Sequence, residues 1–478
     1  MDVSGPNSLG VFGSNDIIYY EDRDTYESGR PYGEGTDGDK HTAAEAEKHY
    51  VVNITKPGAY RVTGQLSFGQ IRIDLGEDAQ KEPSAVVELI LDNAQIGCTV
   101  APAIVFMNVY ECDGERNEDN ATPDVDTAEA GANLILEGKN TVTGSHVAKI
   151  FKDKKDEKKL WKQDAAVYSY MSMNIFGPGE LCINADNEGL GTEMHLTVNG
   201  GHITILSDND GINTNEDNLS VTTVNAGNLH IVAGLGEEGD GIDSNGYLVI
   251  NGGTVISAAK PVSDSGLDSS CGSFIHGGTV VALGAAMDWA ESDSDQVTMN
   301  LQFSRRQKGL LQIVTEEGRE VFSFDPASDP VLKDYDRGYQ GAVVSCPAFQ
   351  VGDSYHVYAE QMQMAYASTD VMRGPGGFGG DKGQRPEGFD GQMPAFGEGN
   401  PPAMPEGEMP TRPAGQAPVR PDGNRGDRDN RRPGGEPPAG WGLEDNRNPD
   451  SMHPAGTGST RFYMQDKVNF FSGLSSAE

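Results

Sequence analysis

The most constraining feature of this sequence is a unit of about 26 residues that occurs four times. The copies read TVNGGHITI from Thr197, TVNAGNLHI from Thr223, VINGGTVIS from Val249 and FIHGGTVVA from Phe274. A glycine holds the same place in each copy, at positions 201, 227, 253 and 278, and this spacing is typical of repeat architectures. Apolar and polar residues alternate on both sides of that glycine, which indicates strand, tight turn and strand. Because so short a unit cannot bury its own apolar face, the repeat predicts an all-β chain of stacked copies, a parallel β-helix.

The alignment also predicts which side chains share a column along the stack. Neighbouring strands lie about 4.8 Å apart, so equivalent residues of successive copies should touch. We expect two apolar columns, Val198, Val224, Ile250 and Ile275 in the first and Ile203, Leu229, Val255 and Val280 in the second. A third column should consist of Asn199, Asn225 and Asn251, whose amides can bond one another at the bend. His276 takes this place in the last copy, where we expect it to bond its neighbour.

Composition shifts divide the chain into five segments. We expect an irregular acidic lead-in over 1–48, the β-helix over 49–295, a β-rich cap over 296–370, a disordered Gly/Pro-rich segment over 371–458, and a terminal strand over 459–478 that rejoins the cap. The cap is expected because exposed strand edges at the end of a stack invite aggregation. Disorder is expected over 371–458 because such a composition cannot bury enough apolar surface to offset chain entropy.

The charge balance excludes several classes of partner. The chain has 73 Asp and Glu against 36 Lys and Arg, which gives a net charge of −37. Nucleic acid and anionic membranes are therefore not expected as partners, because binding them requires a basic surface. The five cysteines are odd in number and form no C-x-x-C pair, which argues against a disulfide framework and a cysteine zinc site.

Targeting signals are absent from the printed sequence. No apolar run has the length of a membrane span, so we expect no transmembrane segment. The chain opens with Met1-Asp2-Val3-Ser4 and has neither a basic region nor an apolar region of a signal peptide. The protein is then expected to be intracellular, or exported by a signal that this sequence does not include.

A second repeated motif combines acidic residues with glycine. It reads DNDGIN from Asp208, GDGIDSNG from Gly239 and DSGLD from Asp264, with a weaker version, DNEGL, from Asp186. If the glycine turns stack, Asn213, Asp243 and Asp268 form one column, and Asp210 lies over Asp240.

Stacked carboxylates favour a bound cation. Two bare carboxylates one strand apart repel by about 3–4 kcal/mol at an effective dielectric constant of about 20. Calcium offsets this repulsion, because oxygens on opposite sides of one ion lie about 4.6–5.2 Å apart. The predicted ligands are Asp208, Asp210, Asn213, Asp240, Asp243, Asp264, Asp268 and Glu188. The alternative, that these residues only form turns, stays open because D-G is a common turn dipeptide.

These motifs together resemble a bacterial carbohydrate-binding-domain family that was long classed as a domain of unknown function. The matching stretches are the D-G-I turns, the G-G-T-V strands, ITKPGAYRVTGQL from Ile54, LILDNA from Leu89, AAVYS from Ala165, VGDSYHVY from Val351 and the Gly/Pro-rich tail. The resemblance implies a right-handed parallel β-helix like that of pectate lyases. It also implies calcium binding, an extracellular or cell-surface location, and association with plant polysaccharides such as cellulose or pectin. Only two turns keep the full D-G-I core, so fewer metal sites are expected here.

Three functional classes remain in competition. A non-catalytic, calcium-dependent polysaccharide-binding protein is expected first, a pectate-type lyase second, and a structural surface protein or adhesin third. A lyase needs a base beside calcium, but Lys260 is the nearby cation in sequence, and His202 and His230 are expected to be exposed strand residues. Calcium could bridge to uronate carboxylates, whereas neutral glycans would stack on aromatics, for which Tyr247 and Trp289 are the candidates.

Overall fold

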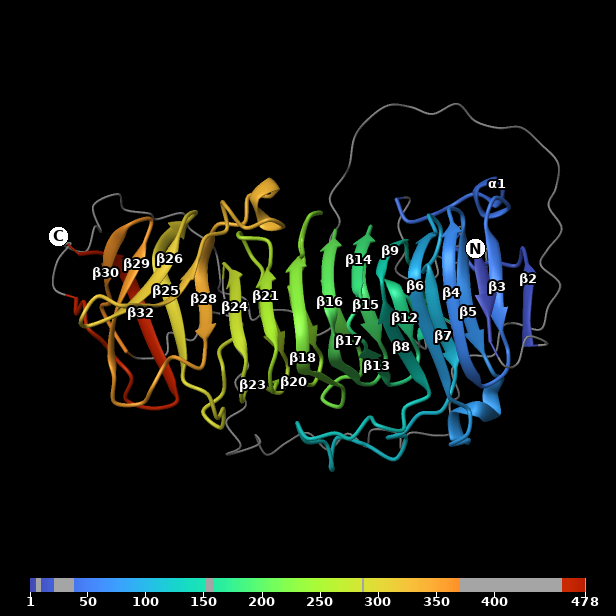
Figure 1. Ribbon diagram of the computed structural model, residues 1–478, viewed down its shortest axis with the longest axis horizontal. Coiled ribbons are helices and arrows are strands. Elements are labelled where there is room, and N and C mark those ends of the chain that lie inside the picture. The colour runs from blue at the N-terminus through green and yellow to red at the C-terminus, as the bar shows by residue number, and fades with distance from the viewer. Residues whose placement is uncertain (6–9, 21–37, 152–158, 286–287, 370–457, 478) are drawn as a thin grey trace, which may run out of the picture.

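The computed structural model describes residues 1–5, 10–20, 38–151, 159–285, 288–369 and 458–477. The predicted disordered segment 371–458 therefore lies almost entirely outside the described residues. The molecule is elongated, and strands from successive units lie side by side along its length (Figure 1). The short helices in the described ranges include α1 (Ala43–Ala46) and the 3-10 turns Glu77–Lys81 and Leu332–Asp334. No helix among the described residues is long and apolar enough to span a membrane.

One face of the stack is a nine-stranded sheet. Its strands, in order, are β2 (Val11–Ser14), β3 (Tyr50–Ile54), β5 (Gly69–Asp74), β7 (Ile104–Asn108), β12 (Ala165–Ser169), β15 (Glu188–Thr192), β17 (Ile212–Thr214), β19 (Ile242–Ser244) and β22 (Leu267–Ser269). Strands β2 and β3 are antiparallel, and every later pairing is parallel. Each unit of the repeat therefore contributes one strand to this face.

A second, 21-stranded sheet forms the other faces. Its strands in the repeat region are β1 (Asp2–Ser4), β4 (Gly58–Leu66), β6 (Val87–Gly97), β8 (Ala132–Glu137), β9 (Lys139–Gly144), β13 (Met173–Phe176), β14 (Glu180–Ala185), β16 (Leu196–Ser207), β18 (Val221–Val232), β20 (Tyr247–Ile250), β21 (Thr254–Ala258), β23 (Ser273–Ile275) and β24 (Thr279–Gly284). The longest strands bend and pair twice: β6 pairs with β8 and β9, and β16 with β13 and β14. A separate hairpin joins β10 (Val147–Phe151) to β11 (Lys159–Gln163).

The same sheet continues into a C-terminal module. This module contains β25 (Thr298–Gln307), β26 (Leu311–Thr315), β27 (Glu320–Phe324), β28 (Tyr339–Ser345), β29 (Ser354–Ala359), β30 (Met362–Ala365), β31 (Phe462–Tyr463) and β32 (Val468–Ser476). Strand β24 pairs antiparallel with β28, β28 pairs antiparallel with β25, and β25 pairs parallel with β32. The module has its own buried core, which shares Val232, Ala258, Val281 and Leu283 with the repeat region.

The predicted fold class, a right-handed parallel β-helix with a C-terminal β-rich cap, is wrong, although the chain is all-β. Parallel pairings close a ring of six strands, β6, β8, β13, β16, β14 and β9, to which the remaining strands of the larger sheet are added. That sheet also runs without a break into the antiparallel strands of the C-terminal module. The repeat period fixes which residues pair between units, but it carries no information on how bent strands join two faces into one sheet.

The predicted columns are confirmed by the register. Val198 pairs with Val224, Val224 with Ile250, and Ile250 with Ile275. The second column, Ile203, Leu229, Val255 and Val280, is likewise paired in register. All eight side chains are buried, so each column is a continuous part of the core.

The asparagine column is confirmed by its hydrogen bonds. Asn225 Nδ2 donates to Asn199 Oδ1 at 2.9 Å, and Asn251 Nδ2 donates to Asn225 Oδ1 at 2.8 Å. At the end of this column, His276 Nδ1 lies 3.0 Å from Asp295 Oδ2, a partner that the repeat did not predict.

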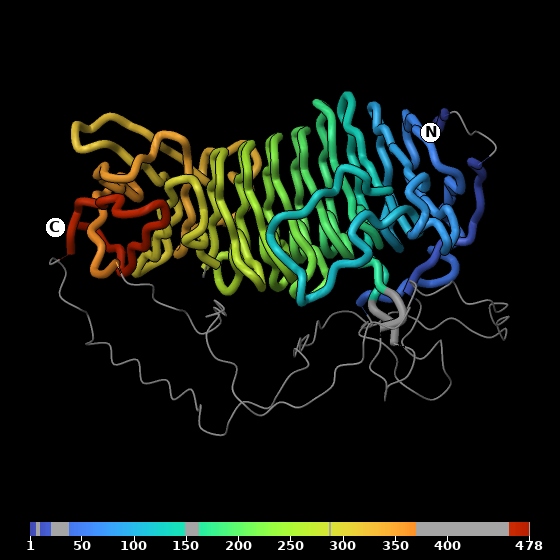
Figure 2. The backbone as a smooth tube through the Cα atoms, turned by 90° about the horizontal axis from the view of Figure 1, so that it is seen from below, coloured from blue at the N-terminus to red at the C-terminus, as the bar shows by residue number. Residues whose placement is uncertain are grey.

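One long connection crosses the outside of the larger sheet. We call residues 109–131, which join β7 to β8, the strap. Figure 2 shows the strap passing over the strands of several later units before the chain returns to β8. The strap therefore contacts residues more than a hundred positions later in the sequence.

Candidate acidic site on the nine-stranded sheet

The first acidic column lies on three neighbouring strands of the nine-stranded sheet. Asn213 of β17 pairs with Asp243 of β19, which pairs with Asp268 of β22. The residues on either side of Asp243, Ile242 and Ser244, are fully buried. Because side chains alternate across a strand, this column faces away from the core. The repeat thus places an amide and two carboxylates one strand apart, as predicted.

The second column occupies the turns that precede these strands. Gly189 N donates to Asp210 O at 3.0 Å, and Gly211 N donates to Asp240 O at 2.9 Å, so Glu188, Asp210 and Asp240 stack. The Asp210 carboxylate accepts a hydrogen bond from Asp240 N at 2.7 Å. These bonds hold each turn on the one stacked next to it.

Burial and mutual repulsion dominate the electrostatics of this column. Burial, together with Asp243, Asp240 and Glu188, raises the pKa of Asp210 well above its usual range. Burial and the nearby Asp268 raise the pKa of Asp240 to about 8. Burial and Asp164 raise the pKa of Glu188 to about 7. Three carboxyl groups in one column therefore resist ionisation at neutral pH, which is the situation that a cation relieves.

Two oxygens in these columns are buried with no hydrogen-bond donor among the described residues. They are Glu188 Oε2 and Asn213 Oδ1, and the two side chains are joined through Asn213 Nδ2, which donates to Glu188 Oε1 at 3.0 Å. Buried acceptors normally have a partner, so such atoms require an explanation. Carboxylate and amide oxygens are the ligands that calcium prefers. The donor chemistry therefore fits the predicted ion.

The geometry does not form a ready-made cage. Within the part of the chain that the structure describes, no three His, Cys, Asp or Glu side chains come together as a metal-binding group. Asp208 is exposed at the edge of the site, and Asp264 Oδ2 accepts from Gly239 N at 3.1 Å. Binding an ion would require the carboxylates to converge from their present hydrogen bonds. Calcium binding thus stays a prediction.

The two ends of the columns carry residues that the sequence analysis missed. At one end, the buried Lys162 of β11 pairs with Asp164 at 2.5 Å and also contacts Asn215. At the other end, Asp288 accepts from Ser269 Oγ at 2.7 Å, and burial raises the pKa of Asp288 to about 7. Lys162 follows the mixed-charge run 152–159 and Asp288 follows the last repeat, so neither belongs to a repeated motif that would have revealed it.

The predicted aromatic residues lie elsewhere. Tyr247 is on β20 of the larger sheet, where its hydroxyl donates to Ala121 O of the strap at 3.4 Å. Trp289 is partly buried against the core and meets the ring of Phe470 edge-on at 6.2 Å between centroids. The structure does not bring either ring into the acidic columns. His230, predicted to be exposed, lies within 3.0 Å of Asp329 and is largely covered.

Comparison with known proteins gives this chain a family. A family model described as "Carbohydrate-binding domain-containing protein" matches residues 48–301, just over half of the chain. The chain belongs to this family. The resemblance drawn from the turn and strand motifs is therefore confirmed at the level of the family.

Two relatives are informative about extent. A carbohydrate-binding domain-containing protein of Acetivibrio thermocellus is 32% identical over 155 residues, which cover 32% of this chain and 44% of that relative. The chain thus spans less than half the length of the relative that it matches. A solved structure titled as a polysaccharide lyase-like protein from C. thermocellum is 26% identical, and the match covers 48% of this chain and 83% of that one with a TM-score of 0.32. A score of this size does not establish a common overall fold.

Proposed function

We propose that this member of the carbohydrate-binding domain family binds polysaccharide without cleaving it, with the help of calcium ions held at the acidic columns. The observation that carries the calcium part is the pair of buried, unpartnered oxygens of Glu188 and Asn213 beside carboxyl groups with raised pKa values. Asp210, Asp240, Asp243 and Asp268 would supply most of the negative charge at the ion. A bound ion with free positions could then bridge to the carboxylate of a uronic acid.

Binding is favoured over lyase chemistry by the state of Lys162, a cation that acts on Glu188. A β-elimination needs an unprotonated base beside the metal. Burial alone would lower the pKa of Lys162, but Asp164, Glu188 and Glu193 outweigh it and raise the pKa above its usual value. Lys162 therefore stays protonated and acts as a structural counter-ion. Lys162 in this state cannot serve as that base, which favours retention of the ligand over its cleavage.

The location and the ligand class belong to the same proposal. We place the protein outside the cell or at the cell surface, where calcium is abundant enough to fill sites of millimolar or submillimolar affinity. Plant cell-wall glycans such as pectin and cellulose are the ligand class. A net charge of −37 argues against direct binding of a polyanion, so an acidic glycan would need the ion as a bridge.

Thermal unfolding with and without calcium tests the metal. An ion that binds only the folded state stabilises it by RT ln(1 + [Ca]/Kd), which is about 2.7 kcal/mol at a hundredfold excess over Kd. We expect the melting temperature to rise with calcium and to fall with EGTA. Asp240→Asn keeps an acceptor for Ser265 N but removes a charge, so most of the rise should disappear. The matched control is Asp217→Asn, at an exposed position outside the columns.

Retention on insoluble glycans tests the ligand. Wild-type protein should be retained on pectin, and EGTA should release it, with no soluble sugar formed. The ultraviolet absorbance of a 4,5-unsaturated uronide in the supernatant would reject binding in favour of a lyase. A melting temperature that responds to neither calcium nor EGTA would reduce the acidic columns to turn-forming residues.

A further inference from the structure

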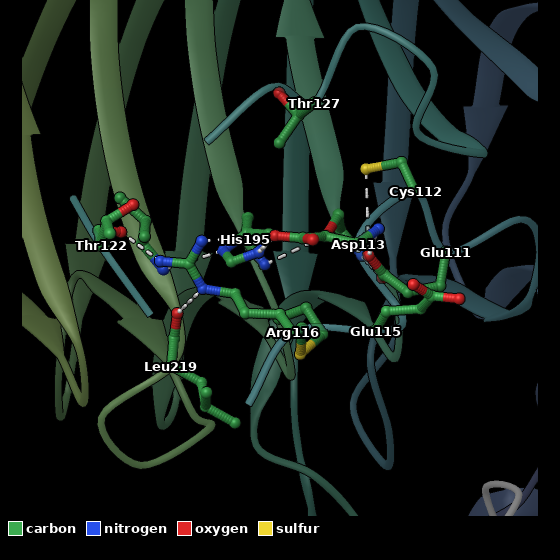
Figure 3. A network of polar contacts seen from close by, with 12 residues as sticks. Glu111, Cys112, Asp113, Glu115, Arg116, Thr122, Thr127, His195 and Leu219 are labelled. Carbon is green, nitrogen blue, oxygen red and sulfur yellow. Dashed lines mark hydrogen bonds and ion pairs between the residues drawn. The ribbon is translucent and has the colours of Figure 1, made fainter. Parts of the chain in front are cut away.

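The strap begins at two buried anchor points on the repeat units. Glu111 accepts hydrogen bonds from Ser172 N at 2.6 Å and from Ser172 Oγ at 2.8 Å. Asp113 Oδ2 lies 3.2 Å from Nε2 of His195, which is fully buried (Figure 3). Val221 N donates to Nδ1 of the same ring at 3.0 Å, so Nε2 carries the proton that the Asp113 carboxylate accepts. The first part of the strap is therefore held by polar contacts to two units, and His195 links it to Val221 of a third.

The middle of the strap reaches units further along the stack. Arg116 Nε donates to Leu219 O at 3.0 Å, and the same guanidinium donates to Thr122 O within the strap. Beyond that point, Tyr247 Oη donates to Ala121 O. Arg116 thus fixes the turn of the strap to the corner of a unit more than a hundred residues away in sequence.

The returning part of the strap is anchored once more. Thr127 Oγ1 lies 2.7 Å from Asn174 Oδ1 and 2.8 Å from Thr197 Oγ1. Asn174 Nδ2 donates to Thr127 O at 2.7 Å. All three side chains are buried. With both arms anchored, the strap forms a fixed wall that stands over the sheet.

Between this wall and the sheet lies a groove of about 580 Å³. Its floor is formed by corresponding residues of five successive units. These residues are Phe176, Asn199, Asn225, Asn251 and His276. At about 4.8 Å per strand spacing, four spacings give a floor about 19 Å long that runs along the stack. A groove of this volume is within the range of small-molecule binding sites, and its length suits an extended chain.

The asparagine column gives the floor a repeated hydrogen-bonding capacity. An amide offers two N–H donors and a carbonyl oxygen with two lone pairs. Within the column, Asn225 uses one donor toward Asn199 and accepts one bond from Asn251. Each of these amides therefore keeps a donor and an acceptor for a ligand. Its position is held by the hydrogen bonds along the column. One amide per strand spacing, about 4.8 Å, matches the length of roughly one sugar ring in an extended chain.

The charge of the lining residues determines whether a charged or an uncharged ligand is favoured. Asp124 and Asp126 of the strap face the groove, and the described lining includes no Lys or Arg. An anionic sugar would meet repulsion there and no counter-charge. Phe176 and Val249 supply apolar surface against which the C–H face of a sugar ring can pack. Amides, carboxylates and an apolar floor together suit the hydroxyl groups and C–H faces of an uncharged sugar.

We propose that the groove beneath the strap binds one extended, uncharged polysaccharide chain, with Asn199, Asn225 and Asn251 each serving a successive sugar. This inference rests on the proposed polysaccharide binding but places a site on the 21-stranded sheet, away from the acidic columns. Binding in the groove requires no metal ion. The same protein then has two glycan-binding faces of different chemistry, one calcium-dependent and one not.

Titration calorimetry with defined hexasaccharides tests the groove. Uncharged β-1,4-linked hexamers of glucose, xylose and mannose are titrated into full-length protein in EGTA, and hexagalacturonate is titrated with calcium and with EGTA. At least one uncharged hexamer should bind in EGTA. Asn225→Ala combined with Asn251→Ala should weaken this binding at least tenfold. The control Asn228→Ala changes an exposed residue of the same strand, beyond the glycine turn, and should alter affinity less than twofold.

Each result separates the groove from the calcium site. Failure of all three uncharged hexamers, or unchanged affinity in a double variant that melts like wild type, overturns the groove. If the double variant melts early, Asn251→Ala alone is used, and unchanged affinity there has the same consequence. Binding of hexagalacturonate with calcium but of no uncharged hexamer keeps the proposed function and rejects the groove. Binding of no hexamer rejects both.

Discussion

A single histidine shows how charge holds the N-terminal segment to the stack. His146 lies 3.1 Å from Asp186 and 3.4 Å from Asp39, and its side chain is largely covered. Burial alone would lower the pKa of His146, but hydrogen bonds to both carboxylates outweigh it and raise the pKa to about 10. The imidazolium form is therefore the one that the folded protein holds at neutral pH, at a position where neighbouring charges are mostly negative.

The pH dependence of stability follows from that shift. A histidine whose folded pKa exceeds its unfolded value of about 6.5 contributes fully below pH 6.5, and the contribution is lost as pH rises toward 10. We expect His146→Gln to lower the free energy of unfolding by about 1–3 kcal/mol at pH 6, and by much less at pH 10. Thermal unfolding from pH 6 to 10 measures this, with the exposed His202→Gln as the control. A deficit that is constant across this range would contradict the charged pairing.

At the scale of the element, the repeated turn shows why glycine recurs. Gly201, Gly227, Gly253 and Gly278 all have φ between 78° and 94°, a region that L side chains rarely adopt. The turns also stack closely. A Cβ at Gly227 would lie 2.8 Å from Gly200 C and Gly201 O of the preceding unit. Glycine is thus required for two reasons. The backbone at this position has a positive φ, and a Cβ would clash with the preceding turn.

These two requirements can be separated by substitution. Gly227→Ala should cost the strain of positive φ, about 1–2 kcal/mol, and a further cost from the clash with the preceding turn. Gly318→Ala is the matched control, because Gly318 has φ of 82° in a hairpin turn where no atom lies within 4 Å of the added Cβ. Chemical denaturation of both variants should give a clearly larger loss for Gly227→Ala. Equal losses of stability in the two variants would mean that the stacked turns accommodate the added Cβ at no energetic cost.

How much of the structure the sequence predicts also differs from one element to another. The apolar columns, the asparagine column and the stacked acidic turns were predicted because their residues recur at one period. Lys162 and Asp288 were not, since they come from single segments whose positions depend on tertiary packing. The six-stranded ring was missed for a related reason: a bend within β6 or β16 lets one strand pair with two, and alternation of residue types is the same on both sides of a bend.

At the scale of the whole molecule, the chain leaves and re-enters the C-terminal module at one place. Tyr366 N donates to Ser459 O at 3.0 Å, and Ser459 N donates to Tyr366 O at 3.1 Å. Strand β32 then pairs with β25 and with β30. The rings of Phe462 and Phe471 pack against each other in the core of this module, with their centroids 4.8 Å apart. The last strands are thus integral to the module, whatever lies between residues 369 and 458.

Replacement of the intervening segment tests this arrangement. Because Tyr366 and Ser459 already meet, residues 370–457 can be replaced by an eight-residue Gly/Ser linker. Closing the shorter loop costs about 2 kcal/mol less entropy, so the melting temperature should stay or rise. Removal of residues 459–478 should instead expose the core around Phe471 and destabilise the module strongly. Calorimetry of both variants measures the difference, and a destabilised linker variant would contradict it.

The strap has a consequence for the order in which the chain matures during synthesis. Its anchors at His195, Leu219 and Tyr247 are translated well after the strap itself, with Tyr247 emerging 126 residues after Ala121. At about 5–20 residues per second, Tyr247 is synthesised about 6–25 seconds after Ala121. The groove can therefore close only after the middle of the stack has folded, so a nascent chain cannot engage a sugar there before its own core is complete.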